Sequence, residues 1–187
     1  MKNSMEINPI KSVAKSIFLN DVTQKLLELE FKLEHSGDAT SPIAQQLPHW
    51  RRLLQALQEA LKGWGWSSPN PSVGCVIASP QNGRVLAQGF HRKAGNPHAE
   101  IEAIAKLGTV TQDSSTDFWV LDSKHHSALK GAEMYVTLEP CAHRGRTPSC
   151  AQTLAQLPLK KVWFLLRDPN PLVAGRGKAI LERAGIE

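Results

Sequence analysis

Between residues 73 and 185, short apolar segments alternate with amphipathic ones, and this alternation is what most limits the fold. Strands are predicted where a short apolar run is bounded by turn residues, at residues 73–79, 84–91, 132–139 and 160–166. Helices are predicted where apolar residues recur at helical spacing, at residues 98–108, 148–157 and 177–185. Strands that alternate with helices predict a three-layer α/β domain, in which helices cover both faces of a largely parallel sheet.

The first part of the sequence has a different, helical texture. Apolar residues at helical spacing predict two helices, at residues 10–18 and 22–35. The stretch SGDATSP then interrupts the pattern, and Pro48 fits the first turn of a further helix. We therefore expect two parts, an N-terminal helical extension over residues 1–47 and a second domain over residues 48–187.

Composition and charge exclude several classes of protein. No run approaches the ~18 apolar residues of a membrane span, and the N-terminus lacks the features of a secretory signal or a transit peptide. A cytoplasmic protein without membrane contact is therefore expected. The formal net charge is +5, but the dense basic and aromatic–basic runs of a nucleic-acid groove are missing. Residues 109–130 are polar and irregular, which predicts a surface insertion.

Three cysteines in a chain without a secretion signal argue against a disulfide framework and favour metal binding, catalysis or simple burial. Cys75 lies in the apolar run VGCVIA, where a small buried hydrophobe is expected. Cys141 and Cys150 instead lie in the polar, turn-rich stretch TLEPCAHRGRTPSC, where burial alone explains them poorly. Their role depends on which other side chains meet them.

Functional side chains of α/β sheets gather where strands end and helices begin, and three metal-ligating residues fall at such places. His98 opens one predicted helix, and Cys141 directly follows a predicted strand. Cys150 lies one turn into the helix predicted to begin at Pro148. One imidazole and two thiolates can hold a catalytic zinc, which keeps its fourth position for water. Glu100, two residues after His98, could then carry a proton from the attacking water to a leaving amine.

Each of these residues alone has a plainer interpretation. A histidine at a helix start is often a cap or a surface residue, and a first-turn glutamate is often solvated. Two cysteines could also form a purely structural zinc site with a fourth protein ligand such as His143. A complete ligand triad beside a carboxylate nevertheless favours a zinc deaminase, for which the order His-x-Glu, Pro-Cys and a second Cys is typical.

Four longer motifs add a resemblance to a known family. They are PNPSVGCVI, GFHRKAGNPHAE, TLEPCAHRGRTPSC and DPNPLVAGRG, at residues 69–77, 89–100, 137–150 and 168–177. Their order, and the long gap between the cysteines of PCAHRGRTPSC, resemble the pyrimidine deaminase of riboflavin biosynthesis, diaminohydroxyphosphoribosylaminopyrimidine deaminase, within the cytidine-deaminase-like superfamily. The resemblance covers residues 48–187 and implies a three-layer α/β/α fold around a mixed sheet.

The resemblance also implies roles for individual residues. Zinc (Zn2+) would be bound by His98, Cys141 and Cys150, with Glu100 as the proton shuttle. Substrate contacts are implied for Asn70, His91, Arg146, Thr147, Asp168 and Asn170. The implied hydrolase reaction deaminates 2,5-diamino-6-ribosylamino-4(3H)-pyrimidinone 5′-phosphate, and a reductase, on a separate chain or in a missing domain, carries out the next step.

The sequence departs from the family pattern at several points. Residues 1–47 have no counterpart in it, Ser149 stands where Thr-Pro-Pro-Cys is common, and the sequence stops where a last strand is expected. Whether the protein is deaminase-only or truncated, and whether it is a homo-oligomer, stays open. Two rival functions remain: a deaminase of another nucleoside, nucleotide or tRNA base, and a non-catalytic zinc-stabilised module.

Overall fold

The structure is a computed structural model that describes residues 23–25, 27–33, 35, 40–112, 116, 118–169 and 173–187. The chain folds as two compact units, Met1–Leu54 and Gln55–Glu187. The described residues between 23 and 35 are helical, which confirms the second predicted helix in that part. The helix predicted at residues 10–18 lies outside the described residues, and the domain boundary after residue 47 stays a prediction.

Helix α2, Pro42–Lys62, begins earlier than the sequence predicts. The Ser41 hydroxyl accepts a hydrogen bond of 3.2 Å from the Ala44 N–H and so caps the helix start. Pro48 lies inside the helix, and the prediction that it opens the helix is wrong. Both prolines suit a first turn, but only the first follows a capping residue. No helix in the described part of the chain, α2 included, combines the length and the apolar character needed to cross a membrane.

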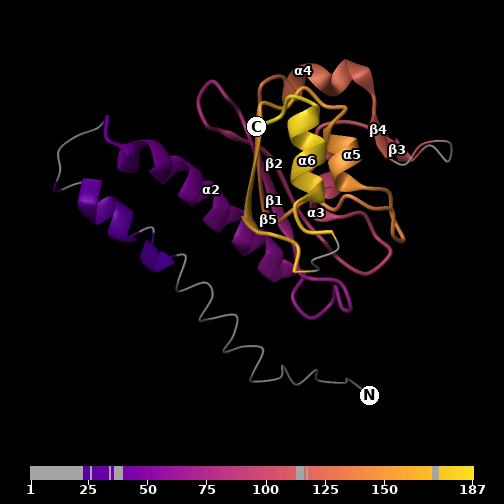
Figure 1. Ribbon diagram of the computed structural model, residues 1–187, viewed down its shortest axis with the longest axis horizontal. Coiled ribbons are helices and arrows are strands. Elements are labelled where there is room, and N and C mark those ends of the chain that lie inside the picture. The colour runs from indigo at the N-terminus through magenta and orange to yellow at the C-terminus, as the bar shows by residue number, and fades with distance from the viewer. Residues whose placement is uncertain are drawn as a thin grey trace. The chain divides into compact units, whose positions relative to one another are not determined.

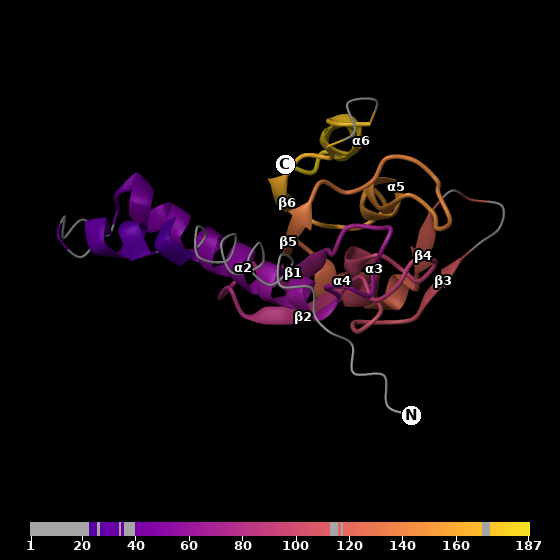
Figure 2. The same cartoon turned by 90° about the horizontal axis from the view of Figure 1, so that it is seen from below.

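The second unit is built on a four-stranded sheet of β1 (Gly74–Ala78), β2 (Val85–Phe90), β5 (Glu133–Leu138) and β6 (Lys161–Leu166), which confirms the four predicted strands. The strand order is β2-β1-β5-β6, as Figure 2 shows. β1 pairs antiparallel with both of its neighbours, whereas β5 and β6 pair parallel. The sheet is therefore mixed, and the expectation of a largely parallel sheet is wrong. The short β1–β2 turn reverses the chain, so β2 runs opposite to β1.

Three helices, α3 (Ala99–Ile104), α5 (Cys150–Leu154) and α6 (Arg176–Arg183), gather on one side of this sheet (Figure 1). Their apolar side chains share one core with the strands. This core includes Ile77, Ile101, Met134, Leu154 and Leu181. Burial of each such side chain contributes about 1.5–3 kcal/mol. The core thus holds the first turns of α3 and α5 in place near the carboxyl end of β5.

Two glycines let helices approach the sheet closely on opposite faces. A side chain at Gly74 in β1 would overlap the α2 backbone at Ala56. A Cβ at Gly89 in β2 would lie only 2.6 Å from the Ala103 nitrogen of α3. Gly89 pairs with Cys75, the neighbour of Gly74, so the two glycines face opposite sides of the sheet. The predicted three-layer α/β/α arrangement is therefore confirmed.

The segment at residues 109–130, predicted to be irregular, contains regular structure. β3 (Val110–Gln112) and β4 (Trp119–Leu121) form a small antiparallel sheet, followed by the 3-10 helix η1 (Ser123–His125) and helix α4 (His126–Leu129). The expectation is wrong because a few apolar side chains anchor the segment. Leu121 and Leu129 are buried in the core, and Trp119 packs against it.

The last residue, Glu187, is hydrogen-bonded beside the start of β6. Its N–H donates to the Lys160 carbonyl at 3.1 Å, and its carbonyl accepts from the Val162 N–H at 2.9 Å. Ile186 next to it is buried in the core. The predicted lack of a further strand stays a prediction.

Candidate active site and metal centre

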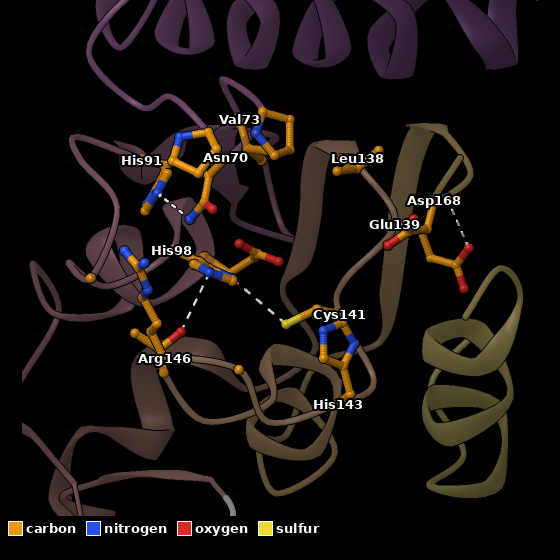
Figure 3. Close-up of a pocket in the computed structure, with 16 residues that line it drawn as sticks. Asn70, Val73, His91, His98, Leu138, Glu139, Cys141, His143, Arg146 and Asp168 are labelled. Atoms are coloured by element: carbon orange, nitrogen blue, oxygen red, sulfur yellow. Dashed lines mark hydrogen bonds between the residues drawn. The ribbon is translucent and has the colours of Figure 1, made fainter. Parts of the chain in front are cut away.

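A cavity of about 310 Å³ lies in the second unit, where β5 and β6 end and α3 begins (Figure 3). Segments far apart in the sequence line it together. Of the residues predicted for the site, it is lined by Asn70, His91, His98, Glu100, Cys141, Arg146, Thr147 and Asp168. Cys150 is fully buried beside Cys141. Asn170 lies outside the described residues.

The three predicted metal ligands converge at the floor of this cavity. His98 Nδ1 lies 3.6 Å from the Cys141 sulfur and 3.3 Å from the Cys150 sulfur. The three ligand atoms all lie within 4.8 Å of one another. His143 lines the cavity but is not in the ligand group found among the described residues, which argues against a four-ligand structural site.

This donor set fits a zinc ion. Zinc bonds of ~2.0–2.1 Å to nitrogen and ~2.3 Å to sulfur, at a tetrahedral angle, separate nitrogen from sulfur by about 3.6 Å. The two measured nitrogen–sulfur distances are close to that value. Three ligands of this kind could therefore hold an ion and leave one tetrahedral position toward the cavity.

His98 is available for a metal because its side chain does not serve the helix. It is the N-cap of α3 with an extended backbone, φ −72° and ψ 166°, and its ring makes no capping hydrogen bond. The ring instead turns toward the cavity, where Thr147 Oγ1 lies 3.3 Å from Nε2. The plainer interpretation of His98 as a helix cap thus does not hold for its side chain.

Hydrogen bonds clamp the two cysteines to each other through the start of α5. The Cys141 carbonyl accepts from the Ala151 N–H at 3.0 Å and from the Ser149 hydroxyl at 2.8 Å. The Cys141 sulfur accepts from the Cys150 N–H at 3.3 Å. Ser149 also accepts from the Gln152 N–H at 3.2 Å and is the N-cap of α5. The helix therefore begins at Cys150, and the expectation that Pro148 begins it is wrong.

The two thiols differ in their affinity for protons. The hydrogen bond from Cys150, and then that with His98, lowers the pKa of Cys141 to about 4 despite burial. The same hydrogen bond to Cys141, together with burial, raises the pKa of Cys150 well above its ordinary value. Burial lowers the pKa of His98, but the hydrogen bond with Cys141 and the charge of Glu100 outweigh it, so its pKa is raised. The two opposite shifts favour a metal-free pair in which Cys141 gives up its proton before Cys150 does.

Zinc binding to the metal-free protein is expected to release at least one proton, because Cys150 must lose its thiol proton to become a ligand. Zinc affinity should accordingly weaken as the pH falls, by about tenfold per pH unit for each proton displaced. Titration with zinc in a weak buffer containing a pH indicator measures the release. A Cys75→Ala variant, whose mutated residue lies outside the ligand group, should release the same amount. Binding without proton release would contradict the assignment of the proton to Cys150.

Glu100 lies in the first turn of α3 and is only 3% exposed, although its carboxyl lines the cavity. Burial raises the pKa of this carboxyl, and the neighbouring His98 partly opposes the shift. A carboxyl group with a raised pKa both takes up and gives back a proton near neutral pH more readily than an ordinary glutamate. The surface interpretation of Glu100 is therefore excluded by its burial.

A buried hydrogen-bond chain orients Asn70 at the cavity wall. His91 Nδ1 lies 3.0 Å from the Pro97 carbonyl, which only accepts, so this nitrogen carries the ring proton. His91 Nε2 then accepts from the Asn70 amide nitrogen at 3.0 Å. Burial lowers the pKa of His91, which favours this neutral form. Asn70 lines the cavity, and the hydrogen bond to His91 uses its amide nitrogen and not its amide oxygen.

The cavity also contains Glu139, which the sequence did not single out, and His143, which was considered only as a possible fourth zinc ligand. Glu139 lines it next to Asp168, and His143 lines it near Cys141. Glu139 directly precedes the Pro-Cys pair, which is the only signal in the sequence that could have drawn attention to it. Arg146 and His143, which lie between the two cysteines, are exposed. They therefore present a guanidinium and an imidazole at the rim of the cavity to an incoming substrate.

A family model described as the cytidine and deoxycytidylate deaminase zinc-binding region matches residues 49–166. The chain belongs to this family. The match includes the positions of all three ligand residues and of Glu100. Zinc binding by this deaminase family agrees with the geometry of the cluster of His98, Cys141 and Cys150.

Individual relatives of this chain agree with the family. The riboflavin biosynthesis proteins RibD of Haemophilus influenzae and Escherichia coli are 47% and 40% identical to it over 135 residues. Each match covers 72% of this chain but 31% of the relative, so the chain spans about a third of the length of these relatives.

Solved structures give the same result. RibD of Acinetobacter baumannii, form 1, matches with a TM-score of 0.61 at 44% identity, over 73% of this chain and 33% of the other. A Thermotoga maritima protein described as a diaminohydroxyphosphoribosylaminopyrimidine deaminase and 5-amino-6-(5-phosphoribosylamino)uracil reductase matches with a TM-score of 0.57 at 37% identity, over 73% and 34%. The predicted resemblance and the predicted fold class are confirmed.

Proposed function

We propose that the chain is a zinc-dependent hydrolase that deaminates 2,5-diamino-6-ribosylamino-4(3H)-pyrimidinone 5′-phosphate in riboflavin biosynthesis. The observation that carries this proposal is the convergence of His98, Cys141 and Cys150 beside the buried carboxyl of Glu100 in one cavity. The RibD relatives, together with the Thermotoga maritima structure described as this deaminase and a reductase, support the choice of substrate.

We assign zinc to His98, Cys141 and Cys150. When bound there, zinc supplies a Lewis acid that activates water for attack on the ring carbon bearing the amine. Glu100 takes a proton from the attacking water and returns it to the departing amine, which leaves as ammonia. The buried position of Glu100 keeps bulk water from competing for this proton.

The remaining cavity residues bind and orient the substrate in this proposal. Asn70 offers its amide oxygen to an N–H of the pyrimidine, because His91 fixes its amide nitrogen. His91 itself acts through Asn70 more than through direct contact. Asp168 accepts from further N–H or hydroxyl groups of the substrate. Asn170 keeps the substrate role that the family resemblance implies.

Arg146 and Thr147 suit the phosphate end of the substrate. An arginine guanidinium presents paired N–H donors that match phosphate oxygens. Arg146 is exposed at the cavity lining, so it can meet a charged group that stays partly in water. Thr147 is buried, and its hydroxyl also contacts the His98 ring. It therefore lies between the proposed phosphate-binding residue Arg146 and the metal-binding residues.

We further propose that a reductase consumes the product, either on a separate chain or as another domain. The Thermotoga maritima relative, described as both deaminase and reductase, supports this step. A cytoplasmic location and a homo-oligomeric state stay predictions.

The test combines zinc quantification with ammonia release from four compounds: the proposed substrate, its dephosphorylated form, cytidine and deoxycytidylate. We expect one zinc per chain and the fastest release from the phosphorylated diaminopyrimidine. Preference for cytidine or deoxycytidylate would replace the proposed substrate by another of this family. Bound zinc with no ammonia from any compound would favour the non-catalytic zinc module instead.

A further inference from the structure

Glu139 is a buried carboxylate whose hydrogen bonds lead away from the metal centre. It follows β5 directly, precedes the Pro140–Cys141 pair, and is 4% exposed. Its carboxylate accepts from three backbone N–H groups, those of Asp168 at 3.4 Å, Gly175 at 2.9 Å and Lys178 at 3.2 Å. A buried carboxylate needs such partners, because an unsatisfied buried charge is costly.

These three N–H groups belong to two elements that follow β6. Gly175 and Lys178 lie at the start of α6, where the first N–H groups of a helix have no partners within the helix. A negative charge at this end is also favoured by the helix dipole. Gly177 packs so closely on the Pro140 carbonyl that a side chain there would overlap it. The start of α6 is therefore seated against the segment that leads into Cys141.

Asp168 is held by the same carboxylate just beyond the end of β6. Its backbone N–H donates to Glu139, while the residue lines the cavity that also contains Glu100 (Figure 3). In addition, the Glu139 N–H donates to the Leu166 carbonyl at 2.8 Å. Glu139 thus links the chain at Asp168 to the chain at Cys141 from both its backbone and its side chain.

We infer that Glu139 is a positioning residue that sets Asp168 against the substrate. It fixes the backbone on both sides of the loop between β6 and α6, so that Asp168 meets a substrate whose reacting carbon is placed by the metal centre. The inference rests on the proposed function for its kinetic part. If Asp168 contacts bound substrate and transition state equally, loss of its positioning should raise KM more than it lowers kcat.

The test uses the zinc-loaded protein with Glu139→Gln and Glu139→Ala. Gln keeps one of the two carboxylate oxygens, whereas Ala keeps neither, so the effect should be graded. We expect KM for the proposed substrate to rise about tenfold or more in the Ala variant and less in the Gln variant, with kcat changed by less than about threefold and zinc content unchanged. Glu133→Gln is the matched control, since Glu133 lies on the same strand but accepts from the Tyr135 hydroxyl and the Trp163 ring N–H.

A second readout does not depend on activity. Amide hydrogen exchange at Asp168, Gly175 and Lys178 should accelerate by about tenfold or more in Glu139→Ala, by less in Glu139→Gln, and stay unchanged in Glu133→Gln. Unchanged exchange at these three amides in Glu139→Ala would overturn the inference whatever the activity. An equal fall of kcat and zinc content would also overturn it, since that marks a general structural role. If the unmodified protein released no ammonia, the proposed function would fail, and the exchange data would still decide whether Glu139 holds these segments.

Discussion

A Glu100→Ala variant is expected to keep its zinc and to lose ammonia release by about 10²–10⁴-fold in kcat. The reason is that Glu100 is the carboxyl that lines the cavity beside the ligand group, and its raised pKa suits proton transfer in both directions. None of the metal ligands is altered, so zinc content per chain should stay at the unmodified level. Zinc quantification and an ammonia assay on the same sample make the comparison.

Glu102→Ala is the matched control for this experiment. Glu102 lies on the same helix, two residues further on, but pairs with Arg92 at 3.3 Å and does not line the cavity. Loss of an exposed ion pair of this kind costs at most about 1 kcal/mol of stability and should leave kcat within about twofold. Full activity in Glu100→Ala, with the zinc retained, would remove the proposed mechanism.

A Cys150→Ala variant is expected to lose both zinc and activity. It removes one of three ligands, so zinc affinity should fall by more than the roughly 100-fold that changes around a ligand can cause. The fold should persist, because α5 is capped by Ser149 and the core is built from many apolar side chains. Zinc content after dialysis, ammonia release and the far-UV circular dichroism spectrum give the three readouts.

The third cysteine provides the comparison for Cys150→Ala. Cys75 is also fully buried and forms no disulfide, but it lies in β1 and is not in the ligand group. Its replacement by alanine removes one buried sulfur and should cost a modest amount of stability, about 1–2 kcal/mol, without loss of zinc. Retention of stoichiometric zinc in Cys150→Ala would contradict the ligand assignment.

The four strands of the main sheet and the convergence of the three candidate ligands could be predicted from the sequence because their signals are local. Each strand of the main sheet is a short, mainly apolar segment bounded by turn residues, and the candidate ligands are residue types that need a special reason to stand in polar turns. His98, Cys141 and Cys150 were expected to meet because strand ends and helix starts share one edge of an α/β sheet. The structure places their ligand atoms together.

Other features could not be read in this way because they depend on contacts distant in sequence or on competing local signals. The partners of Glu139 lie 29, 36 and 39 residues away and are backbone groups, which leave no mark in the sequence. β3 and β4 have three residues each, too few for a pattern to emerge. The start of α2 was misplaced because two prolines fit a first turn, and the capping role of Ser41 decides between them.

The segment from Cys141 to Cys150 carries two candidate metal ligands and, between them, candidate substrate-binding residues. Hydrogen bonds from Ser149 and Ala151 to the Cys141 carbonyl hold the two ends of this segment together. Because these ends are hydrogen-bonded to each other, the residues between them form a loop whose length need not alter the distance between the two sulfurs. Members of a family can therefore differ in the length of this loop and in loop residues such as Arg146, while the geometry of the metal-binding residues stays the same. Substrate specificity and metal binding can in this way evolve independently.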